Sequence, residues 1–204
     1  MYVSKLTPVT KAKYKVYLDD EFAFVLYKGE LSLYGIQEGM ELSQSVVDRI
    51  KKEVLEKRAK LRAMHILERA DRTEAELYAK LKQDQYPEDV IACAMQYVKS
   101  FGYVGDRAYA KRFVESKRRN KSQRELMMLL QQKGIQSEYI SEALEDSYHE
   151  HDEKDTIRKL VEKKHFQIEE ATVEEKKKMF DYLLRKGFRY EDIRQVIQVS
   201  SWNA

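Results

Sequence analysis

The sequence has 204 residues, of which 43% are hydrophobic and 36% are charged, and it holds seven glycines, two prolines and one cysteine. So few turn-forming residues exclude an all-β sandwich, a propeller and a low-complexity chain, and a single cysteine excludes an intramolecular disulfide and a thiolate-rich zinc site. Lys and Arg exceed Asp and Glu by only 38 to 35, so the total charge does not by itself indicate a nucleic-acid partner.

The chain shows no sign of export or membrane insertion. Its first fifteen residues contain no continuous apolar run, and no segment is long enough to span a bilayer. We therefore expect a cytoplasmic protein without a membrane partner. Cys93 falls in an apolar helical stretch, which favours a small buried hydrophobe over a reactive thiol.

Residues 1–42 are predicted to form a small β-hairpin appendage. Residues 13–18 alternate polar and apolar side chains, an acidic turn follows, and residues 22–27 are rich in aromatic and β-branched side chains. Residues 3–6 are a candidate for a further strand. A hairpin this short needs other elements to pack on, so we do not expect an independent domain here.

From Ser43 onward the hydrophobic period becomes helical. Ser43 is a candidate N-cap, and the helix is expected to run to about Ala70. Its apolar residues fall at steps of three, four and seven, which predicts a single buried stripe. The residues of this stripe are Val47, Ile50, Val54, Leu61 and Met64.

The rest of the chain repeats itself. A segment that begins at Thr73 returns at Ser122, an offset of 49 residues, and the same offset pairs Ala59 with Ala108 upstream. A third copy follows at an offset of 53 residues, where residues 186–188 match residues 133–135. Three copies with a period near 50 residues are typical of stacked helical modules.

These patterns predict an all-α protein with three tandem three-helix repeats. The repeats are expected at residues 43–105, 106–152 and 153–204, and to form an elongated, curved body that carries the small N-terminal β-hairpin appendage of residues 1–42. Stacking of this kind buries one face of each repeat against the next.

The helix ends of the repeats carry local signals. Each middle helix is predicted to begin with a capping box, in which the N-cap hydroxyl accepts from a backbone N–H and an acid three residues later reaches back. The boxes are Thr73…Glu76, Ser122…Glu125 and Thr172…Glu175. Glycine suits the position after a helix, and the candidates are Gly102, Gly134 and Gly187. Pro87 suits the first position of the last helix in the first repeat.

The densest basic segment lies at residues 111–124 and holds seven cations and one acid. Cations seven residues apart share a helical face, and close like charges on a helix repel one another. Because compensating acids are nearly absent, an anionic partner is favoured over a solvated face, and phosphates fit best, although an acidic protein surface would also be attracted. The candidate residues of this basic cluster are Lys111, Arg112, Lys117, Arg118, Arg119, Lys121 and Arg124.

A second basic stretch, residues 49–72, interleaves nine cations with four acids. A salt-bridged exposed face explains it as well as a binding surface does. The additional candidates from this stretch are Arg58, Arg62, Arg69 and Arg72. The aromatic pair Tyr109 and Phe113 is expected to pack in the core and not to stack on bases.

No catalytic residue, metal site or cofactor is predicted. The chain has no P-loop, no G-x-G-x-x-G and no H-E-x-x-H, and no His/Cys or Ser/His group stands out. His149 and His151 are two residues apart and would not face one another on a helix. The acidic stretch around them, residues 142–155, is expected to be a polar junction between the second and third repeats.

Three segments resemble the RecX family of bacterial regulators of the RecA recombinase. They are residues 69–81, 101–113 and 124–135, and with the repeats the resemblance covers roughly residues 59–200. Ser122 stands where the family usually has Gly, and Gly105 where it usually has an acidic residue or Asn. Both departures keep the helix starts, because Ser122 still caps and Asp106 is expected to cap the next helix.

The resemblance implies a function that composition does not. RecX-like proteins do no chemistry themselves; they bind RecA, chiefly as filaments on single-stranded DNA, and restrain filament growth or favour disassembly. They thereby damp homologous recombination and co-protease activity in DNA repair and the SOS response. We therefore expect a monomer that meets the RecA filament, and single-stranded DNA directly or through the filament. The alternatives are a helical-repeat nucleic-acid-binding protein without a RecA partner, and an interaction scaffold whose cations are paired by acids.

Overall fold

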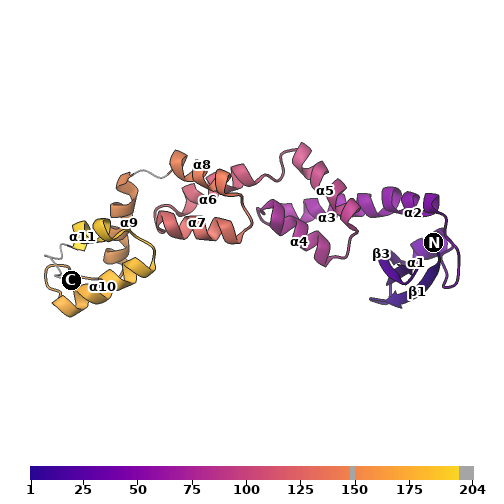
Figure 1. The fold of residues 1–204 in the computed structure, drawn as a ribbon, viewed down its shortest axis with the longest axis horizontal. Coiled ribbons are helices and arrows are strands. Elements are labelled where there is room, and N and C mark those ends of the chain that lie inside the picture. Colours follow the sequence, from indigo (N-terminus) through magenta and orange to yellow (C-terminus); the bar gives the residue numbers. More distant parts are fainter. Residues whose placement is uncertain (148–149, 198–204) are drawn as a thin grey trace. The chain divides into compact units, whose positions relative to one another are not determined.

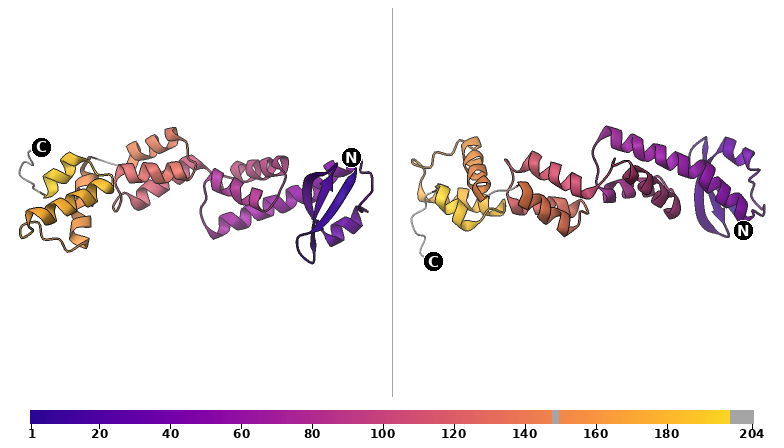
Figure 2. Two further views of the ribbon diagram at one scale, coloured as in Figure 1. Left: turned by 60° about the horizontal axis from the view of Figure 1, so that its bottom comes forward. Right: turned by 90° about the horizontal axis from the view of Figure 1, so that it is seen from above.

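In this computed structural model, which describes residues 1–147 and 150–197, the chain forms two compact units, Met1–Gly105 and Asp106–Ala204. The first unit contains a small sheet and one three-helix module, and the second contains two three-helix modules (Figures 1 and 2). The predicted fold class, mostly helical with three modules and a small N-terminal sheet, is confirmed for these residues. The elongated, curved shape stays a prediction.

The first unit begins with a three-stranded antiparallel sheet in the order β1-β2-β3. Its strands are β1 (Val3–Pro8), β2 (Lys13–Leu18) and β3 (Glu21–Tyr27). The predicted hairpin is β2–β3, and its two-residue loop has φ of 49° at Asp19 and 68° at Asp20. Two positive φ angles are what the commonest two-residue hairpin turn requires, and aspartate tolerates them better than most residues.

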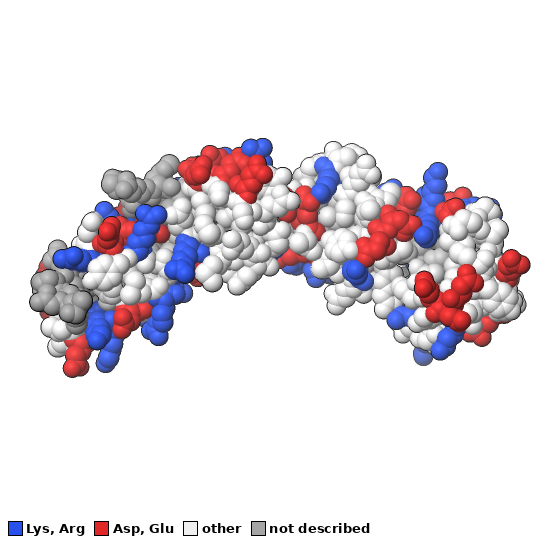
Figure 3. Space-filling view, in the orientation of Figure 1, with Lys and Arg blue, Asp and Glu red and all other residues white. Residues whose placement is uncertain are grey.

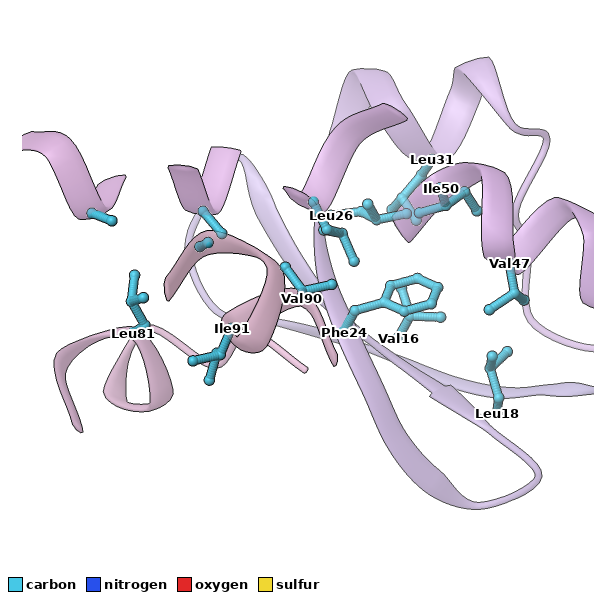
Figure 4. Close-up of a cluster of buried hydrophobic side chains, with 14 of the residues drawn as sticks. Val16, Leu18, Phe24, Leu26, Leu31, Val47, Ile50, Leu81, Val90 and Ile91 are labelled. Atoms are coloured by element: carbon cyan, nitrogen blue, oxygen red, sulfur yellow. The ribbon is translucent and has the colours of Figure 1, made fainter. Parts of the chain in front are cut away.

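The sheet and the first helices share one hydrophobic core. Figure 4 shows Val16 and Phe24 from the sheet lying together with Val47 and Ile50 from the helical run, and the four are 3% exposed or less. A six-residue helix, α1 (Lys28–Leu33), follows β3 directly and has no counterpart among the predicted elements; its Leu31 joins the same core. The short sheet is therefore covered by helices, as its size requires.

The predicted long helix contains a π-helical turn that changes its buried face. The run consists of α2 (Gln44–Ile50), η1 (Lys51–Leu55) and α3 (Glu56–Arg69). Val47 and Ile50 are buried before the turn and Ala59 after it, whereas Leu61 is 59% exposed. A π turn accommodates one residue more than an α turn, so the prediction of one continuous stripe through Leu61 is wrong. Ser43 is the N-cap, although its hydroxyl bonds to Ser45 Oγ.

Two helices complete the first module, α4 (Glu74–Gln83) and α5 (Glu88–Ser100). Pro87 is the N-cap of α5 and so lies one residue earlier than predicted. None of the described helices is both long enough and apolar enough to cross a membrane.

The second unit contains two modules with separate cores. They are α6 (Asp106–Lys117), α7 (Gln123–Gln132) and α8 (Ser137–Ser147), then α9 (Glu150–Lys163), α10 (Val173–Arg185) and α11 (Tyr190–Ile197). Corresponding residues of the middle helices, Leu81, Leu130 and Leu183, are fully buried. The offset fails upstream, because Ala59 is buried and Ala108 is exposed, so the first helices use a different register.

The helix ends follow the predicted chemistry with one exception. The boxes at Thr73 and Thr172 are complete, and the three glycines that follow helices have φ between 69° and 88°. Ser122 caps α7, but in the described part of the chain Glu125 does not complete the box, because its carboxylate turns to Lys121. Asp106, the expected cap of α6, is its first residue.

Candidate anion-binding surface of the second unit

The basic cluster spans the end of α6, the turn at residues 118–120 and the start of α7. α6 packs against α8 in the same module, and α8 is rich in acidic residues. Figure 3 shows acidic side chains gathered over α8. The cations of the cluster therefore lie in two different electrostatic settings, one beside α8 and one beyond it.

The cations on the α8 side of α6 are paired. Arg107 forms a bidentate pair with Glu142, with Nε to Oε2 at 2.7 Å and Nη2 to Oε1 at 2.6 Å. The Nζ atom of Lys111 lies 3.0 Å from Asp146 Oδ2, and this hydrogen bond raises the pKa of the lysine. Both pairs join residues 35 apart in sequence. The expectation that compensating acids are nearly absent is thus wrong for Lys111, the member of the basic cluster in these two pairs.

Two further members of the cluster are tied into the protein. Arg118 is half-buried, and its Nη1 donates to the carbonyl of Ser147 at 2.7 Å, while its own carbonyl accepts from Thr156 Oγ1 at 3.0 Å. Lys121 pairs with Glu125 across one helical turn. The bond from Thr156 places Arg118 at the junction of the second and third modules, whereas the pair of Lys121 lies inside the second module.

The remaining members face solvent. Arg112, Lys117, Arg119 and Arg124 are all exposed. Among the described residues, no carboxylate lies within ion-pair distance of Lys117, Arg119 or Arg124. An exposed cation without a carboxylate keeps its full charge available to a phosphate.

The four additional candidates lie in the first unit. Arg58 pairs with Glu30, donates to the Val25 carbonyl at 3.2 Å and lies 4.6 Å from the ring centroid of Tyr27. Arg62 Nε lies 2.7 Å from Asp84 Oδ2. Arg58 and Arg62 thus hold the helices and the sheet of that unit together.

Arg69 and Arg72 close the same stretch. Arg69 is exposed at the last residue of α3 and Arg72 is half-buried beyond it. The four additional candidates belong to the first unit, and the basic cluster belongs to the second.

One residue of the acidic stretch, Glu153, contacts the second module, whereas Glu142 and Asp146 pair with α6 inside that module. Glu153 is 7% exposed, and its Oε1 accepts from the backbone N–H of Gln123 at 3.1 Å, which links the third module to the second. Burial raises the pKa of this carboxyl. His149 and the side chain of His151 lie outside the described residues, and the described part holds no cluster of three His, Cys, Asp or Glu that could bind a metal.

Tyr109 and Cys93, which are expected to pack inside the protein, both contact neighbouring side chains. Tyr109 is buried and stacks on Phe113, with ring centroids 6.1 Å apart, so this pair belongs to the core of the second module. Cys93 is half-buried, with Sγ 3.0 Å from Glu56 Oε2. Burial, followed by the Glu56 carboxylate, raises the pKa of this thiol, which favours an unreactive side chain.

Sequence reasoning missed several cations that join the basic cluster in space. Lys159, Lys163 and Lys164 of the third module line one pocket with Lys117 and Lys121. The only signal in the sequence is the helical spacing of Lys159 and Lys163, which places both on one face of α9. Nothing in the repeat pattern indicates that this face meets the end of α6.

Comparison with known proteins supports one family along most of the chain. Three family models match in order: RecX, first three-helix domain, at residues 59–97; RecX, second three-helix domain, at residues 106–144; and RecX, third three-helix domain, at residues 152–197.

Similar proteins carry the name "Regulatory protein RecX". That of Caldanaerobacter subterraneus subsp. tengcongensis is 33% identical over 93% of this chain and 94% of its own length. That of Clostridium botulinum (strain Eklund 17B) is 30% identical over 92% of this chain and 90% of its own length. That of Clostridium perfringens (strain 13) is 27% identical over 90% of this chain and 87% of its own length.

Two solved structures share the fold. "Crystal structure of regulatory protein RecX" has a TM-score of 0.64 at 24% identity and covers 97% of this chain and 98% of that one. "Crystal structure of RecX from Lactobacillus salivarius" has a TM-score of 0.59 at 23% identity and covers 71% of this chain and 95% of that one.

Proposed function

This chain belongs to the RecX family, and we propose that it is a non-enzymatic, monomeric regulator that binds the RecA recombinase and its filaments on single-stranded DNA in the cytoplasm. Its main effect is to inhibit filament growth, and with it recombination and co-protease activity in DNA repair and the SOS response. The observation that carries this proposal is the ordered match of all three RecX domains to the three helical modules.

The exposed cations supply the electrostatic part of this function. Lys117, Arg119 and Arg124 have no carboxylate partner among the described residues, so they are the members of the basic cluster best suited to phosphates. Contacts with phosphates position a protein on DNA without telling it which complex it has met. Preference for a filament over bare DNA must therefore come from protein–protein contacts, and contacts from several modules raise the effective affinity together.

Two alternatives rest on specific observations. The unpaired cations alone would serve a nucleic-acid-binding protein that has no RecA partner. The pairs Lys111–Asp146 and Lys121–Glu125 favour an interaction scaffold, because each neutralises one cation of the basic cluster. Neither alternative accounts for the match of three RecX domains in order.

A titration of ATP hydrolysis by RecA separates the proposal from the alternatives. RecA filaments are formed on a single-stranded oligonucleotide that is in excess over RecA, and the chain is added at a concentration well below that of RecA. A regulator of filament growth lowers ATP hydrolysis at this ratio, because one bound chain affects many subunits. A protein that only competes for DNA lowers hydrolysis when its concentration approaches that of the binding sites, and that result would refute the proposal.

A further inference from the structure

One pocket of the second unit is lined almost entirely by lysines. It has a volume of about 580 Å³ and lies where the ends of α6, α9 and α10 meet. Six of its nine lining residues are lysines and none is acidic. The lysines are Lys117, Lys121, Lys159, Lys163, Lys164 and Lys186.

Little negative charge in the described protein balances these six ammonium groups. Glu125 pairs with Lys121, and its Oε1 lies 3.9 Å from the Nζ atom of Lys186. Within the described residues, Lys159 and Lys163 have no carboxylate partner, like Lys117. Close ammonium groups repel one another, so the pocket gains stability when an anion enters it.

Helix dipoles do not account for the gathering of lysines. Lys117 and Lys163 are the last residues of α6 and α9, and Lys186 is the C-cap of α10, all positions where a cation is favoured. However, each helix end carries only about half a negative charge. Three ends and Glu125 together remain well short of six positive charges.

An adjoining groove indicates which anion fits. This second hollow, of about 610 Å³, shares Tyr182 and Lys186 with the lysine pocket. It adds exposed apolar side chains, among them Met128 at 51% and Leu184 at 41% exposure, with Arg124 at its rim. The Nζ atom of Lys164 lies 4.3 Å from the ring centroid of Tyr182, so a cation and an aromatic ring stand at the passage between the two hollows.

The passage is held in place by close packing between the modules. Ser122 Oγ donates to the carbonyl of Lys186 at 2.6 Å. Gly187 has φ of 88°, and a Cβ atom at this position would lie 3.0 Å from Ser122 Oγ and 3.2 Å from Arg124 Cβ. Because the chain can come this close only at a glycine, Lys186 is fixed at the mouth of the pocket before any ligand arrives.

We infer that the lysine pocket binds consecutive phosphate groups of a single nucleic-acid strand, and that the adjoining groove takes the bases of that strand. A nucleic-acid strand combines an anionic backbone with flat, largely apolar bases, and binding sites for single strands pair basic grooves with aromatic or apolar platforms. A free polyphosphate would fill only the first hollow. The inference adds a binding site to the proposed function, and it rests on that function for the identity of the strand as the single-stranded DNA on which RecA filaments form.

The test compares two triple variants of the full chain. Lys159→Gln, Lys163→Gln and Lys164→Gln remove three charges from the pocket. The control, Lys176→Gln, Lys177→Gln and Lys178→Gln, removes three charges from α10 outside both hollows. Circular dichroism verifies that both variants are folded. Binding of fluorescein-labelled oligo(dT) is followed by anisotropy over a range of NaCl concentrations, and tripolyphosphate is used as a competitor.

We expect the pocket variant to bind oligo(dT) at least about tenfold more weakly at low salt, and its log–log salt slope to fall by about 0.7 for each phosphate that it no longer neutralises. The control variant should keep most of the affinity. Equal effects of the two variants would overturn the inference. Tight binding of tripolyphosphate without binding of oligo(dT) would assign the pocket to free phosphates and overturn its assignment to a strand.

Measurements with RecA filaments distinguish failure here from failure of the proposed function. Loss of oligo(dT) binding with retained inhibition of RecA supports the pocket and places the regulatory contacts on other surfaces. Unchanged oligo(dT) binding with retained inhibition overturns the pocket alone. Tight oligo(dT) binding by the unaltered chain without any effect on RecA supports the pocket and refutes the proposed function.

Discussion

Ser122 is the residue whose replacement tests the junction between the second and third modules most sharply. Its side chain is fully buried and makes two hydrogen bonds: Oγ accepts from the backbone N–H of Glu125 at 3.1 Å and donates to the carbonyl of Lys186 at 2.6 Å. Ser122→Ala removes both bonds and changes the volume very little. The destabilisation is therefore shared between the start of α7 and the end of α10.

The loss of these two hydrogen bonds determines how much Ser122→Ala lowers the free energy of unfolding. Removal of the N-cap costs about 1 kcal/mol, and the Lys186 carbonyl left without its donor costs roughly 1–2 kcal/mol more. We expect a total of about 2–3 kcal/mol on this basis. Thr172→Ala is the matched control: Thr172 caps α10, and its side chain bonds to Glu175 within the same capping box, so its removal should cost about 1 kcal/mol.

Native-state hydrogen exchange measures these free energies helix by helix in the full chain. This choice matters because a protein with several modules need not unfold in one step, whereas exchange reports local opening. Ser122→Ala should reduce protection in both α7 and α10, and Thr172→Ala in the third module alone. If Ser122→Ala reduces protection in α7 only, or costs no more than Thr172→Ala, the bond to Lys186 does not couple the modules.

Three further predictions address charge. The pKa of Glu153 is raised in the folded state, so this group favours folding most at a pH below its unfolded pKa near 4.3, and that contribution is lost as the pH rises through the folded pKa. The stability of the Glu153→Gln variant should therefore increase relative to that of the unaltered chain as the pH rises from about 4 to about 7. Urea unfolding at the two ends of that range checks this prediction. Arg119→Gln should lower the salt slope of oligo(dT) binding by about 0.7, whereas Lys111→Gln, whose cation is paired with Asp146, should leave the slope unchanged; equal slopes for the two variants would contradict the division of the basic cluster. The thiol of Cys93 has a raised pKa and should be alkylated more slowly than free cysteine at mildly alkaline pH, and an equal rate measured by mass spectrometry would refute this.

Features that depend on a few neighbouring residues are predictable from the sequence. At Thr73 and Thr172 the hydroxyl and the acid three residues later form a capping box at the start of the helix. The residue that follows a helix often has a positive φ, which glycine adopts more readily than other residues, as at Gly102. The repeat offset identifies the buried leucines of the middle helices for the same reason, since the spacing along one helix determines which face is buried.

Features that depend on distant residues are not predictable in this way. The spacing that assigns Leu61 to the buried stripe assumes an unbroken α-helix, and the π turn at residues 51–55 is invisible in hydrophobic periodicity. The pairing of Lys111 with Asp146 joins two helices across 35 residues of sequence, so the local charge count overstates the free charge. The lysine pocket collects the ends of three helices from two modules, and no local pattern indicates that Lys117 and Lys163 line the same space.

The ratio of two dissociation constants tests the central claim most directly. The full chain is titrated against a RecA filament assembled on a labelled single-stranded oligonucleotide, and against the same oligonucleotide without RecA, at one moderate salt concentration. A regulator of RecA filaments binds the filament more tightly, and the preference persists when salt is raised, because screening weakens the phosphate contacts more than the protein–protein contacts. Equal or weaker binding to the filament, with both affinities falling in parallel as salt is raised, would contradict the account and identify a protein that binds DNA without regard to RecA.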